Sequence, residues 1–294
     1  MPNVPPVRKP WLAGLILLGL FAAGCSTPFP PPAPKGSFAD NEQAQAIFDR
    51  CLNAHGGDVR TLAEDLNLSL EGEWGALIQR IQPLVADTAY RTTAQERFRP
   101  SQGLYSALWQ GPAGTKKVVR TPTAVEVYYN GTRETDEAKL QAAAMTADAF
   151  QFFHLGPSFL RLRNASFTRV EDGREDGVAY QRLRTTLRPG FGFSPEDEVV
   201  VWIDPVNHRL FRVHFTLNGF ARTRGAHVDT TFREYRQVGP LLVPVVLQER
   251  VRGPIRIKAH DWWMTGADLD RGWEAEAVSG AELTGAAAAP ARAF

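Results

Sequence analysis

The chain has 294 residues, 44% of them hydrophobic and 22% charged, a globular composition that excludes a disordered or collagen-like protein. A formal net charge of +1 gives no electrostatic basis for binding nucleic acid, and two cysteines allow at most one disulfide and no Cys-rich zinc site. The 25 glycines and 21 prolines favour a turn-rich β protein over a helical bundle.

Residues 1–24 have the layout of a secretory signal peptide. Arg8 and Lys9 form a basic segment, and an apolar stretch at 11–23 follows. A helix of this length spans roughly 20 Å, which is too short for a bilayer core of about 30 Å. Small residues directly precede Cys25, so the segment resembles a bacterial lipobox, in which cleavage falls before an acylated cysteine. We therefore predict lipid attachment at Cys25; the alternative is an ordinary secretory signal followed by a chance cysteine.

The predicted anchor places the protein in the bacterial cell envelope. Ser26, rather than aspartate, follows the cysteine, which in enterobacteria-like sorting indicates the outer membrane, facing the periplasm. Residues 25–37 are predicted to be a proline-rich tether, since five of residues 26–37 are proline. In a polyproline II conformation this tether reaches roughly 37 Å. A folded domain is expected over 38–273, followed by a loose Ala-rich tail at 274–294.

The domain is expected to begin with a helix. Asp40 is a suitable N-cap, and an apolar stripe that includes Phe48 and Cys51 ends at 55–57, where glycines follow His55. Cys51 is interpreted as a packed free thiol, with an intermolecular or catalytic thiol as the alternative. A second short helix is possible over 58–66.

From Asn67 onward, short alternating stretches separated by Gly, Pro and Asn turns indicate β-strands. The expected strands are 67–74, 76–84, 88–98, 103–110, 115–121, 124–129, 178–187, 198–204, 209–218, 222–235, 242–252 and 255–264. So many consecutive strands favour one large antiparallel sheet that curls to bury one face, which makes the chain mainly β with helices, an α+β fold.

One helical insertion interrupts the strands. Thr135 can cap a helix over 136–153, and an apolar segment that contains Phe159 and Leu160 follows it. This is the most apolar segment of the mature chain without β alternation. The simplest arrangement lays it on the concave face of the sheet, as a plug.

Five sequence marks follow this order of elements. They are Ala-His-Gly-Gly at 54–57, Tyr-Tyr-Asn-Gly at 128–131, Val-Trp-Ile-Asp-Pro at 201–205, Phe-Arg-Glu-Tyr-Arg at 232–236 and Leu-Val-Pro at 242–244. Over about residues 40–265 the chain resembles the LolA/LolB-like lipoprotein-carrier superfamily. The resemblance implies a half-open β-barrel with a helical lid over an apolar cavity that accepts acyl chains.

The sequence carries no recognisable catalytic signature. G-x-S-x-G, H-E-x-x-H, the P-loop and paired C-x-x-C motifs are absent. His214, His227 and His260 fall in late strands and could converge with Asp229 or Asp261 on a metal. No two of these histidines sit at i, i+2 in one strand, so we expect solvated or hydrogen-bonded histidines and no metal or cofactor. The acidic run within 171–177 is expected to be a solvated hairpin tip.

The sequence thus favours a non-enzymatic, membrane-anchored lipoprotein that binds a lipid, an acyl chain or another hydrophobic ligand. Trp262 and Trp263 must point to opposite faces of their strand, so one packs inside and the other is left for solvent, lipid or a partner. The alternatives are a structural lipoprotein of an envelope complex, recognised through this aromatic pair by an envelope protein partner, and a hydrolase that uses the late histidines and an acid. The candidate cavity residues are Leu140, Ala144, Phe150, Phe153, Phe159, Trp202, Phe215 and Trp262.

Overall fold

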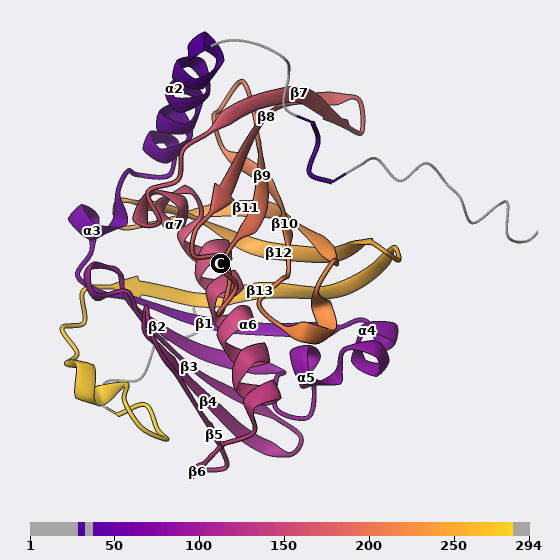
Figure 1. Cartoon of the computed structure of the whole chain (residues 1–294). Helices are drawn as coiled ribbons and strands as arrows, with labels where there is room; N and C mark the ends of the chain where they lie inside the picture. The colour runs from indigo at the N-terminus through magenta and orange to yellow at the C-terminus, as the bar shows by residue number, and fades with distance from the viewer. Residues whose placement is uncertain (1–28, 33–37, 285–294) are drawn as a thin grey trace, which may run out of the picture.

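The computed structural model describes residues 29–32 and 38–284. The predicted signal peptide, Cys25 and the last ten residues lie outside this part of the chain. Within it, thirteen strands form one antiparallel sheet in the order β6-β5-β4-β3-β2-β1-β13-β12-β11-β10-β9-β8-β7 (Figure 1). The sheet curls without closing, so the architecture is a half-open barrel with free edges at β6 and β7, as the sequence and its resemblance predicted.

The strands run in two antiparallel meanders that meet at the centre of the sheet, where β1 pairs with β13. The first meander comprises β1 Leu66–Trp74, β2 Thr93–Arg99, β3 Leu104–Gly111, β4 Gly114–Arg120, β5 Val125–Tyr129 and β6 Thr132–Arg133. The second comprises β7 Thr168–Glu175, β8 Val178–Leu187, β9 Asp197–Ile203, β10 Leu210–Thr216, β11 His227–Val238, β12 Leu241–Gly253 and β13 Ile257–Leu269.

Helices connect and cover these meanders. The longest, α6 (Glu137–Leu155), crosses the concave face and contacts β4 and β5 on one side and β12 on the other (Figure 1). It begins at Asp136, whose carboxylate accepts the Lys139 amide, one residue after the predicted cap Thr135. The others are α2 Phe38–Ala54, α3 Val59–Leu62, α4 Ala76–Ile81, α5 Pro83–Ala86 and α7 Pro157–Leu162. None of the helices in the described residues is long and apolar enough to span a membrane.

The end of α2 is fixed to the sheet by the motif at 54–57. The ring of His55 joins two strands, because Nδ1 lies 3.0 Å from the Leu242 carbonyl and Nε2 accepts the Leu210 amide at 3.1 Å. Gly56 has φ +104° and leaves no room for a side chain, since a Cβ would lie 2.3 Å from the Pro240 carbonyl oxygen. Cys51 is free and buried in this region, which confirms the packed-thiol interpretation.

Several element boundaries differ from the expectation. The stretch predicted as a strand at 76–84 forms α4 and the start of α5. Its apolar residues Ile78 and Ile81, together with Val85 just beyond it, recur at helical spacing rather than at every second position. The acidic run also continues strand β7 as far as Glu175, and only Asp176 and Gly177, both with positive φ, form the turn. The first helix begins at Phe38, two residues before the predicted cap Asp40.

Two predicted strands begin later than expected. The stretches 88–98 and 222–235 start as strands only at Thr93 and His227, since turns occupy their first residues.

The C-terminal segment predicted to be loose instead packs on the convex face over its described part. Val278 is fully buried, and its carbonyl accepts hydrogen bonds from Lys117 Nζ at 2.7 Å and from the Ser106 hydroxyl at 3.1 Å. Lys117 also donates to the carbonyls of Gly280 and Glu282. The segment therefore satisfies an ammonium group that the sheet alone would leave buried without acceptors.

Replacing Val278 with aspartate tests this packing. A carboxylate in place of this fully buried apolar side chain loses its hydration, and Lys117 is already engaged by three carbonyl oxygens, so the free energy of unfolding is expected to fall by about 2 kcal/mol or more. Val206, which is 87% exposed in the β9–β10 turn, provides the matched control Val206→Asp with an expected change within about 0.5 kcal/mol. Urea unfolding followed by tryptophan fluorescence measures both. Equal midpoints for the two variants would show that the segment does not pack on the sheet in solution.

Candidate ligand-binding groove

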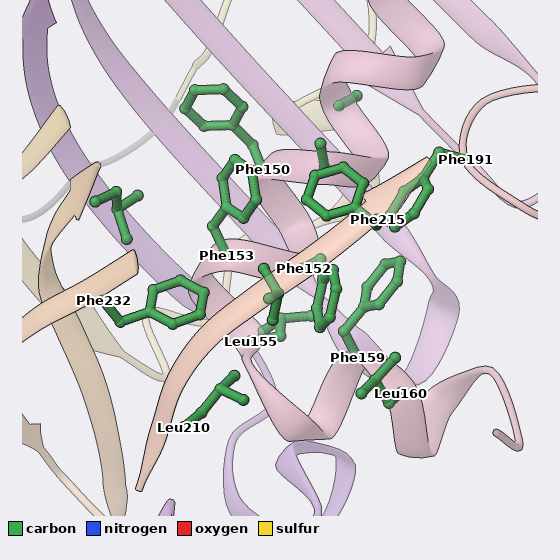
Figure 2. Packing of buried hydrophobic residues seen from close by; sticks show 14 of the residues in the cluster. Phe150, Phe152, Phe153, Leu155, Phe159, Leu160, Phe191, Leu210, Phe215 and Phe232 are labelled. Carbon is green, nitrogen blue, oxygen red and sulfur yellow. The ribbon is translucent and has the colours of Figure 1, made fainter. Parts of the chain in front are cut away.

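The interior of the half-barrel is filled by aromatic side chains. Phe150 and Phe153 of α6 point into it, where Phe150 lies 5.1 Å from Trp109 and 5.8 Å from Trp262 between ring centroids (Figure 2). Phe159 of α7 stacks on Phe152 at 5.1 Å. Of the sequence-predicted cavity residues, Ala144, Phe150, Phe153, Phe159, Phe215 and Trp262 are all buried in this core, and Leu140 is half-buried on the first turns of α6.

A void of about 30 Å³ remains beneath α6, lined by Phe150, Phe153 and His260 among others. This is about the volume of one water molecule. The interior therefore does not hold an acyl chain in this conformation, and these residues act as core.

Trp202 does not belong to this interior. It alternates with Val201 and Ile203 along β9, and these two face α6 while Trp202 lies on the convex face. There its ring packs against Gly173 and beneath the guanidinium groups of Arg182 and Arg212, at 5.2 and 5.0 Å. The prediction that Trp202 lines a cavity is wrong, because the period of the strand places it on the opposite side of the sheet.

An apolar groove of about 220 Å³ opens at one end of the half-barrel. Its walls come from three places: α4 and α5, the β10–β11 connection, and the β12–β13 turn. The apolar lining residues are Trp74, Ile78, Ile81, Val85, Leu217, Ala226, Val228, Val251, Pro254, Ile255 and Ala259. Trp74, Val85, Leu217 and Glu249 also line the void beneath α6, so they form the partition between the groove and the interior.

The sequence contained a signal for this groove, but the prediction of a strand at 76–84 prevented its recognition. Ile78 and Ile81 belong to the stretch 76–84 that was predicted to be a strand, and Val85 follows directly after it. In α4 and α5 these three residues present one apolar side to the groove. Two larger surface hollows, of about 420 and 360 Å³, are lined mainly by polar side chains, several of them arginines. A third, of about 410 Å³, combines Phe159, Leu162 and three prolines with charged groups that include the ion-paired Arg120 and Asp148. The groove is thus the hollow whose lining suits a hydrophobic ligand.

Behind the groove, a guanidinium group is buried among aromatic rings. Arg91 is 3% exposed, and its Cζ lies 4.3 Å from the ring of Trp109, 4.8 Å from Trp74 and 5.0 Å from Phe150. Nη1 donates to the Val85 carbonyl at 2.8 Å, while Nε and Nη2 have no hydrogen-bond partner among the described residues. Cation–π contacts thus replace hydrogen bonds around much of this charge, and burial lowers the pKa of Arg91.

A second buried polar pair joins the sheet to α6. Glu96 of β2 accepts the Tyr105 hydroxyl at 2.9 Å, and its Oε2 lies 3.3 Å from Nε2 of His154. Burial raises the pKa of Glu96 from 4.5 to about 8 and lowers the pKa of His154 from 6.5 to about 3. Both groups are therefore uncharged near neutral pH, so this contact between α6 and the sheet is not an ion pair. The buried ion pair between α6 and the sheet is that of Asp148 with Arg120 of β4, whose Oδ2 and Nη2 lie 2.9 Å apart.

The three late histidines do not form one site. His214 and His227 meet on the convex face, where Nε2 and Nδ1 lie 2.7 Å apart, whereas His260 is on the α6 side, 6.0 Å from Phe150 between ring centroids. No group of three His, Cys, Asp or Glu side chains in the described ranges is arranged to hold a metal. This separation removes the convergence on which the hydrolase alternative depended. Trp262 is fully buried and Trp263 half-buried, so the predicted opposition of the two rings is confirmed.

This molecule is thus a half-open antiparallel barrel with a helix laid across its concave face and an apolar groove at one end. It is similar in fold to a LolA superfamily protein from Nitrosomonas europaea, with 11% identity over 80% of this chain and 97% of that one and a TM-score of 0.48. It is also similar to an outer membrane lipoprotein-sorting protein domain from Vibrio parahaemolyticus, with 13% identity over 81% and 97% and a TM-score of 0.49.

No protein-family model matches the chain, and no curated protein matches it. At identities of 11% and 13%, the structural similarity concerns the arrangement of the chain alone. The ligand and the membrane contacts have to be argued from this molecule's own residues.

The Glu96–His154 pair predicts how stability depends on pH. An unfolded chain ionises Glu96 from about pH 4.5 and the folded one only near pH 8, so this group stabilises the fold at low pH and the stabilisation is lost as pH rises toward 8. His154 acts only below pH 6.5, in the opposite direction. The midpoint of thermal unfolding is therefore expected to fall between pH 6.5 and 8, and Glu96→Gln, which mimics the neutral acid, is expected to flatten this decrease.

Circular dichroism melts at pH 6.5, 7.2 and 8 compare the variant with the parent chain. The exposed Glu276→Gln is the matched control and should keep the slope of the parent. An identical slope for Glu96→Gln and the parent would contradict the assignment of a neutral carboxyl beneath α6.

Proposed function

We propose that this protein is a lipid-anchored envelope lipoprotein that binds a lipid, an acyl chain or a similar hydrophobic ligand in the groove between α4–α5 and the turns of β10–β13. The observation that carries the proposal is the groove itself: eleven of its lining residues are apolar, and Ile81 and Ile255 remain 41% and 43% exposed at its mouth. An exposed apolar hollow of this kind is stabilised when a ligand covers it.

The size of the groove limits what it holds. Its volume of about 220 Å³ is smaller than the roughly 300–1,000 Å³ of typical small-molecule sites, so it covers a section of an acyl chain rather than a whole lipid. A longer ligand extends toward the void beneath α6, and Trp74 is the side chain it has to displace, because Trp74 lines both spaces. The sequence-predicted cavity residues on α6 then form the wall that moves aside to admit the ligand. In this proposal α6 acts as the lid that the sequence predicted.

The polar groups around the groove fit a ligand with a polar head. Arg222, Arg224 and Gln82 stand at the rim, and Glu249 lies at the inner end, 3.4 Å from Nε2 of His260. The arrangement has an apolar middle and polar ends, as expected for an amphiphile that leaves its head at the surface. Anchoring through Cys25 at the outer membrane, with the groove in the periplasm, remains part of the proposal.

Filling the groove tests this function. Ala226→Trp places an indole among the lining residues and is expected to weaken binding of a fluorescent C16 fatty acid about tenfold, since excluding two methylenes removes about 1.6 kcal/mol of burial. Val206→Trp adds the same ring at a position remote from the groove and should leave the affinity unchanged. The affinity is measured by fluorescence titration of the full chain purified from membranes.

Native mass spectrometry of the same preparation identifies any lipid that copurifies. A parent chain that neither carries a lipid nor gains the fatty acid would overturn the proposal and favour a structural envelope protein.

A further inference from the structure

The mouth of the groove combines exposed apolar side chains with unpaired positive charge. Leu77 is 48% exposed, and with Ile81 and Ile255 it makes three of the six large hydrophobic residues that the described chain leaves exposed. Ile81 and Ile255 line the groove, and Leu77 is the neighbour of the lining residue Ile78 in α4, whereas Val178, Phe193 and Val206 lie in other parts of the chain. The exposed large hydrophobic side chains are thus concentrated at this end of the barrel. Such a concentration is typical of a surface that contacts a partner or a membrane.

Four arginines accompany these side chains. Arg222 and Arg224 line the groove, Arg80 precedes Ile81, and Arg256 follows Ile255. None of the four forms an ion pair with an acidic residue in the described ranges. Elsewhere most arginines do, as Arg184 does with Glu198. Of the nearby acids, Glu73 and Asp261 are occupied by Lys258, and Glu249 lies deeper, with only 13% of its side chain exposed. The mouth therefore carries net positive charge around an apolar centre.

The described part of the predicted tether, residues 29–32, lies on the convex face of the sheet, behind strand ends that lead into the groove. Phe29 stacks on His214 at 3.8 Å and on His227 at 4.9 Å between ring centroids, and the Pro31 carbonyl accepts from Arg184 at 3.3 Å. The ring of His227 in turn packs on Gly253, where a Cβ would lie 2.2 Å from Nε2. Gly253 is the last residue before Pro254 and Ile255 of the groove, and Ala226 and Val228 on either side of His227 line it as well. Residues 29–32 and the groove mouth are thus linked through His227 and Gly253, from opposite faces of the same strand ends.

The contacts of Phe29 and Pro31 with the sheet limit the distance between the predicted lipid anchor and the groove. Cys25 precedes Phe29 by four residues, and a fully extended chain of that length spans about 14 Å. Acyl chains on Cys25 therefore bring a bilayer to the end of the barrel that carries the groove.

We propose that this end of the molecule docks on an anionic phospholipid bilayer, with Leu77, Ile81 and Ile255 entering the interface, the four arginines contacting lipid phosphates, and the seated tether holding the groove mouth toward the membrane. Apolar side chains ringed by arginines match the two layers of such a surface, hydrocarbon beneath anionic headgroups. The inference rests on the proposed function in one respect, the purpose of the orientation. With the groove mouth facing the membrane, a lipid passes between bilayer and groove without crossing water.

The orientation is tested on the full acylated chain reconstituted in vesicles of phosphatidylglycerol and phosphatidylcholine. An environment-sensitive dye is attached at Ile255→Cys or, as the control, at Val206→Cys in the exposed β9–β10 turn. Cys51 does not compete for the dye, because it is buried and burial raises the pKa of its thiol. Lipids carrying a quencher in the acyl chain are expected to quench the dye at 255 and not at 206. Equal quenching at both positions, or none at 255, overturns the proposal.

Three further variants separate the contributions of charge and tether. Arg222→Glu with Arg224→Glu is expected to reduce docking on phosphatidylglycerol vesicles by roughly 25-fold or more, since each arginine near an anionic surface contributes about fivefold. Arg233→Glu with Arg236→Glu, an equal charge reversal at the far end of β11, should change nothing. Phe29→Ala is expected to lower the quenching at 255 by releasing the tether. Unchanged quenching in the Arg222/Arg224 variant would exclude an anionic surface as the partner.

The same preparations are titrated with the fluorescent fatty acid, which keeps the two proposals distinct. Loss of quenching with intact fatty-acid binding refutes the docking and leaves the groove function standing. Absence of quenching together with cross-linking between Ile255→Cys chains would assign this face to a second copy of the protein.

Discussion

Because the meander β1–β6 leaves the centre of the sheet toward one edge and β7–β13 returns from the other, the chain has to cross the sheet between Arg133 and Thr168. It does so as α6 and α7 over the concave face, and everything enclosed there depends on this crossing. Phe150, Phe152 and Phe153 are carried into the interior by α6 and fill it. The crossing closes the core of an open sheet, since neither meander can bury its inner face alone.

The same crossing decides where a ligand can bind. With the interior filled, the accessible apolar surface lies at the end of the barrel, where α4 and α5 cover the sheet only in part. Three of the polar groups enclosed beneath α6 are kept uncharged or are surrounded by aromatic rings: Glu96 and His154 are neutral because of their shifted pKa values, and Arg91 makes cation–π contacts. The exception is the buried ion pair between Arg120 of β4 and Asp148 of α6, whose Nη2 and Oδ2 lie 2.9 Å apart, and separation of α6 from the sheet at that point has to break it.

Local pattern accounted for most of the fold. Clean alternation located most strands, as at Val213 and Phe215 on one face with Arg212 and His214 on the other. It failed at Ile78, Ile81 and Val85, where a short apolar run fits a strand or a helix and only the contacts of α4 with β13 select the helix. It failed again after Glu274, where small residues indicated a loose chain, because the buried Lys117 that binds these carbonyls lies more than 150 residues away.

The sequence by itself determined the curled antiparallel sheet, the helical plug, the buried Cys51 thiol and the opposite faces of Trp262 and Trp263, because each follows from residue period and local composition. It also predicted an anchor at Cys25, which lies outside the described residues. Only the tertiary structure decided that the aromatic interior is packed and that an apolar groove with arginines at its mouth forms at one end of the barrel. Those facts depend on pairing between segments far apart in the chain, and no local period encodes such pairing.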